Sequence, residues 1–294
     1  MQPRFVHLHL HSEYSLVDGL VRIKPLVKAV ADGGMPAVAV TDQCNLFAMV
    51  RFYKAAMGAG VKPLIGVDLW LRNDEAANSP YRLVLLAQNL TGYRNLTRLV
   101  SRSYREGQHL GIPQVERAWI TESADGLIAL SGGRDGDLGR ALLANDQVRA
   151  EQSLRGWLAL FGDRYYLQLV RTGREHEEVC VHASVDLAAR WGVPVVATND
   201  VRFVTAEDFP AHEARVCIHD GRTLDDPRRP RAYSEQQYLR SAEEMCELFA
   251  DIPEALENSV EIAKRCNLEL TLGKNYLPDF PIPEGQTIEG YFSE

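Results

Sequence analysis

The chain has 294 residues, of which 46% are hydrophobic and 24% are charged, as is usual for a soluble globular protein. Its 32 basic and 40 acidic side chains give a net charge of −8, which excludes a general electrostatic attraction for nucleic acid phosphates. Five widely spaced cysteines without a C-x-x-C pair, and the lack of an apolar run of ~18 residues, argue against a zinc ribbon and a membrane span, so we expect a cytoplasmic protein.

Apolar strand-like runs alternate with segments of helical period along most of the chain. The expected strands are 5–10, 37–41, 62–71, 81–87, 126–131, 165–169 and 193–198. The expected helices between them are 23–31, 46–59, 92–105, 147–161 and 175–190. This alternation predicts parallel β-α units in an α/β fold, either closed as a barrel or open and doubly wound. In both arrangements polar side chains at the carboxyl ends of the strands share one site.

The last third of the chain has a different character. Residues 220–231 are polar and contain four arginines, and we expect a solvated loop there rather than a DNA contact. Helices are expected at 242–249 and 253–266. Residues 271–294 are rich in proline and end in what resembles the first turn of a helix. We therefore expect a domain over 1–270 and a linker over 271–294 that leads to a further part of a longer protein.

Three histidines occupy alternate positions of the first expected strand. His7, His9 and His11 would therefore share one face of it. Two imidazoles at one strand end are a typical part of a metal site, and carboxylates such as Asp68 and Asp200 follow later strands. The alternative is that His9 and His11 are core histidines bonded to backbone or to Asp200. We expect His7 to serve packing or to be exposed.

Several segments together resemble a known family. Residues 9–19 (HLHSEYSLVDG), 41–46 (TDQCNL) and 131–133 (SGG) resemble the polymerase and histidinol phosphatase (PHP) domain. The form that they resemble most is the PHP domain at the N-terminus of bacterial DNA polymerase III α subunits, on the evidence of residues 196–203 (VATNDVRF), 224–227 (LDDP) and 258–263 (NSVEIA). The resemblance implies a distorted seven-stranded (β/α) barrel with a C-terminal helical extension.

The resemblance also implies a ring of nine metal ligands, of which this chain keeps only part. Active members of the family use this ring to hold up to three ions. The ligand positions that keep a suitable side chain are His9, His11, Asp18, Asp200 and Asp68, where aspartate replaces glutamate. The positions that have lost their ligand are Gln43, Arg82, Gly133 and Arg202. In the sequence itself Asp42 has the pattern of a turn or helix-capping residue.

Two outcomes compete for this altered ring. His9, His11, Asp68 and Asp200 could hold at most one zinc or manganese ion. Alternatively, Arg82 and Arg202 pair with the remaining carboxylates and no ion binds. Arginine stays protonated and cannot coordinate a cation, and a buried carboxylate without a counter-charge is costly. We therefore favour the ion-free network and expect neither a catalytic residue nor a cofactor.

The functional hypotheses follow from the state of this ring. The first is a non-catalytic scaffold that braces a polymerase core of the same chain and docks a proofreading exonuclease subunit, so that it joins the replisome through the full protein. The second is a metal-dependent phosphoesterase, 3′–5′ exonuclease or pyrophosphatase with a reduced metal site. A free-standing phosphatase of amino-acid biosynthesis is a weaker third hypothesis. The resemblance implies DNA-directed DNA polymerase activity, with magnesium, only for the absent core, and we expect weak or no DNA binding by this fragment.

Overall fold

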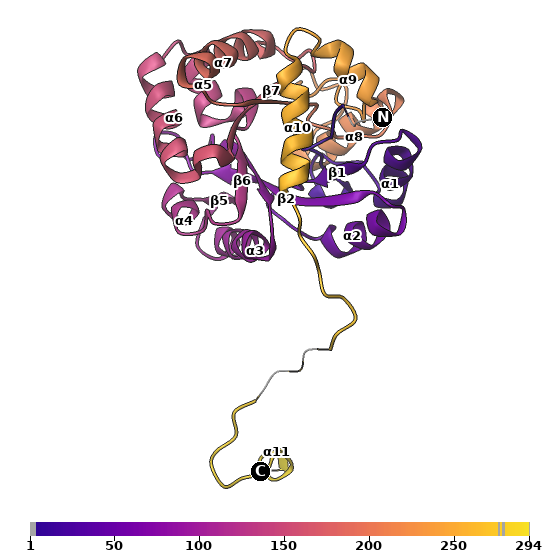
Figure 1. The fold of residues 1–294 in the computed structure, drawn as a ribbon, viewed down its shortest axis with the longest axis vertical. Helices are drawn as coiled ribbons and strands as arrows, with labels where there is room; N and C mark the ends of the chain where they lie inside the picture. Colours follow the sequence, from indigo (N-terminus) through magenta and orange to yellow (C-terminus); the bar gives the residue numbers. More distant parts are fainter. Residues whose placement is uncertain (1–3, 276, 278–279, 294) are drawn as a thin grey trace.

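The computed structural model describes residues 4–275, 277 and 280–293. A mixed β-sheet occupies its centre and helices surround the sheet (Figure 1). The strands are β1 (Ala37–Val40), β2 (Lys62–Leu71), β3 (Tyr81–Ala87), β4 (Gln108–His109), β5 (Ile112–Val115), β6 (Leu127–Leu130), β7 (Tyr165–Val170) and β8 (Val195–Thr198). Their spatial order is β4-β5-β2-β3-β6-β7-β8, and β1 pairs with β2. The expected α/β class is confirmed.

The N-terminal segment 5–10 connects the two ends of this sheet. His7 forms a parallel bridge with Val38 of β1, and Leu10 forms one with Val201, just after β8. The backbone N–H of Ala39 donates to His7 O at 2.8 Å, and that of Val201 donates to His9 O at 3.1 Å. Six of the seven expected strand segments are thus regular strands, and the seventh joins β1 and the segment after β8 through isolated bridges rather than through a continuous ladder.

The expectation that all strands run parallel is wrong for β3. This strand pairs antiparallel with both β2 and β6, whereas β1–β2, β6–β7 and β7–β8 are parallel. The cause is local, because a loop over 72–80 without a helix connects β2 to β3, so the chain simply turns back. As a consequence Arg82, at the beginning of β3, lies opposite Trp70 near the end of β2. Its side chain therefore reaches the rim formed by the carboxyl ends of the other strands.

The helices cover the outside of the sheet. Those that the sequence predicts are α1 (Ile23–Asp32), α2 (Met49–Gly58), α3 (Leu90–Arg105), α6 (Gln147–Phe161), α7 (Glu177–Trp191), α9 (Ala242–Leu248) and α10 (Pro253–Arg265). Those that it does not predict are α4 (Arg117–Thr121), α5 (Asp137–Leu143) and α8 (Phe209–Asp220). Helices α4 and α5 are too short to show a periodic pattern of apolar residues. Helix α8 buries polar side chains such as His212 and Glu213, which interrupt such a pattern. The hairpin β4–β5 is also too short to be read from the sequence.

The strand face that carries the site is otherwise apolar. Leu64 of β2, Val84 of β3 and Ile128 of β6 belong to one buried cluster, together with Val260 and Ile262 of α10. Because side chains alternate along a strand, Leu64 and Asp68 share a face, as do Val84 and Arg82. The polar site therefore lies on an apolar floor that α10 closes by packing against β8.

The 220–231 loop and the stretch after α10 are largely exposed. The 220–231 loop is exposed over most of its length, as expected, and its arginines Arg222 and Arg228 pair with Asp226. Helix α11 (Ile288–Ser293) lies near the end of the proline-rich stretch 271–294, of which residues 276, 278–279 and 294 lie outside the described residues.

All five cysteines are free, and Cys246 is half-buried whereas the other four are buried. Among the described residues no helix has the length and apolar character needed to cross a membrane.

Candidate metal centre and its arginine network

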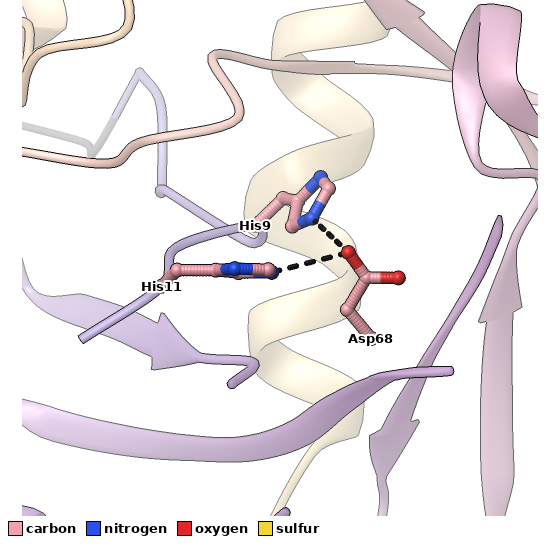
Figure 2. Close-up of side chains that lie close together, drawn as sticks. All are labelled: His9, His11 and Asp68. Carbon is pink, nitrogen blue, oxygen red and sulfur yellow. Dashed lines mark hydrogen bonds and ion pairs between the residues drawn. The ribbon is translucent and has the colours of Figure 1, made fainter. Parts of the chain in front are cut away.

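Two histidines of the N-terminal segment meet one carboxylate of β2. The Nε2 atoms of His9 and His11 each lie 3.1 Å from Oδ2 of Asp68 (Figure 2). One ligand atom from each residue fits within a group whose members lie within 4.8 Å of one another, and all three residues are buried. The structure thus brings together three of the four residues that the sequence predicts as a residual metal position.

The fourth predicted ligand lies beside this group. Oδ1 of Asp200 is 3.3 Å from Nε2 of His9. Asp200 lies two residues after the end of β8 and has a φ of 46°, a left-handed conformation that is unusual for a residue other than glycine. Asp18, from the loop after the N-terminal segment, contacts the other side of His11, with Oδ1 2.8 Å from Nδ1.

Arg82 contacts the carboxylate on which the two histidines converge. Its Nη2 donates a hydrogen bond to Oδ2 of Asp68 and another to Oε1 of Gln43, the latter at 3.0 Å. The Nε2 atom of Gln43 donates in turn to the backbone oxygen of Asp68, also at 3.0 Å. Gln43 and Arg82, two positions at which the resemblance implies a lost ligand, therefore bond to each other and to Asp68.

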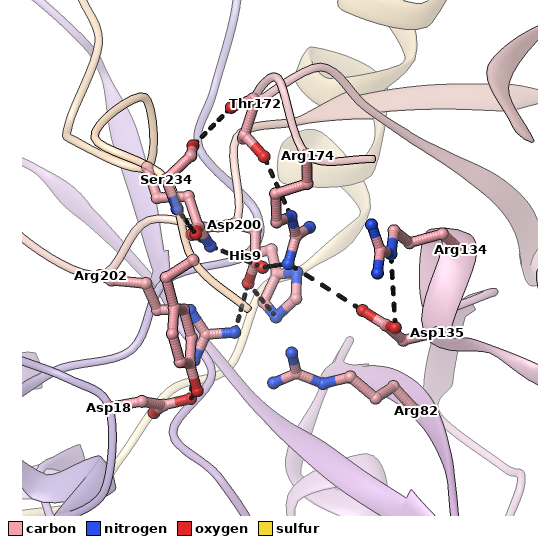
Figure 3. A network of polar contacts seen from close by, with 12 residues as sticks. His9, Asp18, Arg82, Arg134, Asp135, Thr172, Arg174, Asp200, Arg202 and Ser234 are labelled. Carbon is pink, nitrogen blue, oxygen red and sulfur yellow. Dashed lines mark hydrogen bonds and ion pairs between the residues drawn. The ribbon is translucent and has the colours of Figure 1, made fainter. Parts of the chain in front are cut away.

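Arg202 bridges the other two carboxylates from a fully buried position. Its Nη1 donates to Oδ2 of Asp18 at 2.6 Å, and its Nη2 donates to Oδ1 of Asp200 at 2.5 Å (Figure 3). Nη1 also lies next to Nδ1 of His11. A guanidinium can make such a bridge because its donors form a planar fork that matches carboxylate geometry.

The network includes residues that the sequence does not predict. Gln168 of β7 donates to Nδ1 of His9 at 2.8 Å, and Gln237 donates to Oδ2 of Asp200 at 3.0 Å. Tyr233 donates its hydroxyl to Oδ2 of Asp18 at 3.0 Å. Nη1 of Arg174 lies 3.3 Å from Oδ2 of Asp200 (Figure 3). Only Gln168 has a visible signal, since it is a lone polar residue within an apolar strand. The others come from loops whose position in space no local pattern reveals.

Charge pairing keeps the three carboxylates ionised. Burial would raise the pKa of Asp68, but Arg82 and the two histidines hold that pKa below its usual value. Burial opposes ionisation of Asp18 and Asp200 too, and Arg202 is the main cause of their lowered pKa values. The site therefore sets three anionic side chains against the three guanidinium groups of Arg82, Arg174 and Arg202.

The pKa values of the two histidines shift in opposite directions. Burial lowers the pKa of His9. The pKa of His11 is raised, although burial and Arg202 oppose this, because Asp18 and Asp68 face its two ring nitrogens.

Three further residues singled out in the sequence lie apart from the shared carboxylate. Gly133, in the turn after β6, has a φ of 57°, and an added Cβ would lie 3.3 Å from Cγ2 of Val170. Asp42 accepts hydrogen bonds from Ser12 and Ser15 and so anchors a turn, in line with the sequence pattern. His7 is buried, and its Nε2 donates to Arg240 O at 2.8 Å. It therefore serves packing, one of the two roles expected for it.

The donor set only partly suits a metal ion. His9, His11 and Asp68 supply the nitrogen and oxygen donors that zinc and manganese accept. However, the oxygen that faces both histidines is also the acceptor for Arg82. An ion at this position would have to displace a guanidinium group, which itself carries a positive charge. One atom remains open to a ligand, because Oδ1 of Asp68 is buried and has no hydrogen-bond partner.

Comparison with known proteins gives a consistent match. The family model described as the PHP domain matches residues 7–172. The DNA polymerase III subunit alpha of Pseudomonas aeruginosa is 60% identical over 291 residues, which are 99% of this chain and 25% of that protein. That of Escherichia coli K12 is 54% identical over 286 residues, which are 97% of this chain and 25% of that protein. The chain thus spans about a quarter of the length of these relatives.

Solved structures resemble the chain more distantly. An amidohydrolase from Chromobacterium violaceum has a TM-score of 0.46 and 15% identity, over 67% of this chain and 87% of that one. A putative metal-dependent phosphoesterase from Bifidobacterium adolescentis has a TM-score of 0.44 and 12% identity, over 66% of this chain and 86% of that one.

Proposed function

Because the chain belongs to the PHP domain family, we propose that it is the PHP domain of a DNA polymerase III α subunit and acts there as a non-catalytic scaffold. One observation carries the proposal. Arginines stand at two of the family's ligand positions, and each donates to a carboxylate that would otherwise be free for a metal ion. The ion pairs of this network then stabilise the fold, as metal ligation does elsewhere in the family.

The energetic argument concerns the surviving carboxylates. A buried carboxylate needs a cation close by, and either a metal ion or a guanidinium can serve. Here the guanidinium groups of Arg82 and Arg202 are covalently part of the chain, so they are always present. A divalent ion would have to compete with both, and a protein with one weakly held ion lacks the clustered metals that phosphoester hydrolysis uses.

Activity assays test the proposal. We expect no metal-dependent hydrolysis of p-nitrophenyl phosphate or of 3′-labelled single-stranded DNA above background, with Mn²⁺ or Zn²⁺ added. The His9→Ala variant serves as the matched control, because it removes a ring that any active metal site would need. Turnover by the unmodified chain that disappears in His9→Ala would contradict the scaffold role.

A second candidate function has a specific observation in its favour. His9, His11 and Asp68 are arranged as a candidate metal site, and Oδ1 of Asp68 lacks a partner. A divalent ion held by these residues would supply Lewis-acid stabilisation for a phosphoesterase, 3′–5′ exonuclease or pyrophosphatase reaction. The two candidates differ in metal content, because only the second requires a stoichiometric zinc or manganese ion.

The scaffold role includes partners. We propose that residues 1–270 form the PHP unit, with its helical extension, and that 271–294 lead to a polymerase core of the same chain, where magnesium would serve DNA synthesis. The curated relatives support this because they are about four times longer than the chain. We further propose that the domain binds the proofreading exonuclease subunit in a 1:1 complex and so joins the replisome. Calorimetry with the purified subunit tests this, and no heat at high micromolar concentration would contradict it.

A further inference from the structure

Helix α3 carries a row of arginines on its outer face. Its 16 residues include four arginines and no acidic side chain. Arg94, Arg98 and Arg105 are exposed, whereas Leu96 and Leu99 on the opposite side of the helix are buried. At about 100° per residue the three exposed arginines fall within about 40° of one another. They therefore form one stripe, the α3 stripe, along a helix that lies on the outside of the fold (Figure 1).

Acidic side chains do not neutralise the α3 stripe. Glu106 and Glu122 pair with the fourth arginine of the helix, Arg102, at 2.7 Å and 3.0 Å. The guanidinium of Arg102 also lies over the Trp119 ring, 4.2 Å from its centroid. Within the described part of the chain none of the three arginines of the stripe forms an ion pair. Their positive charge is therefore available to a partner outside the chain.

Folding alone does not account for the α3 stripe. Arg98 lies four residues from Arg94 on one side and four from Arg102 on the other, and like charges at this spacing slightly destabilise a helix. Arg98 makes only a long contact, at 3.5 Å, with Oδ1 of Asn95 one turn earlier. An anion bound along the stripe would relieve the repulsion between its arginines.

The composition of this face indicates which anion it fits. The exposed side chains beside the arginines include Thr91 and Ser101, and hydroxyl groups donate hydrogen bonds to phosphate oxygens as arginine does. A separate protein, or a further domain of the same chain, would need an apolar centre surrounded by polar residues. Here arginines occupy the centre, and the large apolar side chains exposed on α3, Leu90 and Tyr104, lie towards the two ends of the helix.

The length of the α3 stripe suits duplex DNA. Arg94 and Arg105 are about 16 Å apart along the helix axis, and about five phosphates of one DNA strand fall within that rise. Single-stranded nucleic acid is bound by aromatic side chains on which successive bases stack. Tyr104 is the one aromatic residue of α3 that is exposed, so the face offers no row of stacking partners.

We propose that the outer face of α3 contacts the phosphate backbone of duplex DNA, weakly and without sequence preference. A chain with a net charge of −8 needs a local basic stripe for such a contact, and the rest of its charge keeps the contact weak. The inference goes beyond the scaffold role and does not depend on it, because no residue of the α3 stripe belongs to the arginine network around Asp68 and Asp200.

The test is fluorescence anisotropy of a labelled duplex of about 20 base pairs, titrated with the 294-residue chain at low ionic strength. We expect the logarithm of the binding constant to fall with the logarithm of the salt concentration, with a slope of about −2.7 for about three phosphate contacts. Arg94→Gln/Arg98→Gln should weaken binding by about tenfold or more and should make the slope shallower by about 1.8. Arg94→Lys/Arg98→Lys should keep most of the binding, because lysine also binds phosphate as a positive charge.

The matched control changes the net charge equally at another place. Arg22→Gln/Lys24→Gln removes two exposed positive charges at the start of α1 and should bind DNA as the unmodified chain does. Thermal unfolding should give an unchanged or higher midpoint for Arg94→Gln/Arg98→Gln, because the two residues are exposed and repel each other.

Several results would overturn the proposal. No binding by the unmodified chain at low salt would do so, as would binding that Arg94→Gln/Arg98→Gln leaves unaltered. Tighter binding of single-stranded DNA than of the duplex would contradict the choice of duplex. Displacement of the duplex by poly-glutamate at an equal concentration of charge would show that the face binds acidic polypeptides instead. The scaffold role would stand in each case, because metal content and activity test it separately.

Discussion

Single side chains explain why the buried carboxylates of Asp18, Asp68 and Asp200 are tolerated inside the protein. Arg202 bridges Asp18 and Asp200, and Arg82 pairs with Asp68. The sequence indicated such pairing because arginines stood where the family has histidines, so the partners of the acids could be named. It could not indicate which arginine meets which acid, since that depends on the direction of β3 and on the turn at Asp200.

Removal of one arginine leaves a buried charge without its partner. We predict that Arg202→Ala lowers the free energy of unfolding by about 3 kcal/mol or more. Lys28→Ala provides the control, because Lys28 pairs with Asp32 on the exposed surface of α1 and such pairs contribute little. Urea denaturation of both variants measures the difference. Equal stability of Arg202→Ala and the unmodified chain would contradict the structural role of the network.

His7 predicts a pH dependence of stability. Burial lowers its pKa from 6.5 to about 4, so the unfolded chain binds more protons than the folded chain between these values. The contribution of His7 to the free energy of unfolding is therefore fully present above about pH 6.5. It is lost as the pH drops towards 4, which lowers the free energy of unfolding by about 3 kcal/mol. In His7→Gln the difference in unfolding free energy between pH 7.5 and pH 5 should be smaller. An unchanged difference would refute this assignment.

At the scale of the elements, close backbone contacts decide how helices join the sheet. In α3 a Cβ added at Gly92 would lie 1.9 Å from the backbone oxygen of Gly126, whereas one added at Gly58 of α2 would meet nothing within 4 Å. We predict that Gly92→Ala destabilises the fold by about 2 kcal/mol or more. Gly58→Ala should be neutral or stabilise by up to about 1 kcal/mol. Thermal unfolding compares the stability of the two variants. Equal changes in stability would contradict this prediction, because they would mean that the backbone at Gly126 moves away from the added Cβ at little cost.

Most elements follow from local pattern, but their directions do not. The strands β1, β2, β3, β6, β7 and β8 have apolar runs bounded by turns, and the long helices have a clear period. The antiparallel course of β3 depends on the 72–80 loop, and helix α8 depends on buried polar residues such as His212, which forms a hydrogen bond with Asp18 O. Neither feature leaves a periodic signal in the sequence.

At the scale of the whole molecule, the site depends on segments that lie far apart in the sequence. Asp18 and Asp68 meet histidines of the N-terminal segment, while Tyr233 and Gln237 reach the network from a loop more than 200 residues later than Asp18. The resemblance to a family identifies the old ligand positions. The residues that now close the site are visible only once the chain is folded, because they occupy irregular segments.

We propose that arginines take the place of metal ions in this domain. The most direct measurement is elemental analysis by mass spectrometry of the purified chain, prepared without chelators and after growth with added zinc and manganese. We expect far less than one ion per chain, both for the unmodified protein and for His9→Ala. One zinc or manganese ion per chain in the unmodified protein, lost in His9→Ala, would contradict this proposal.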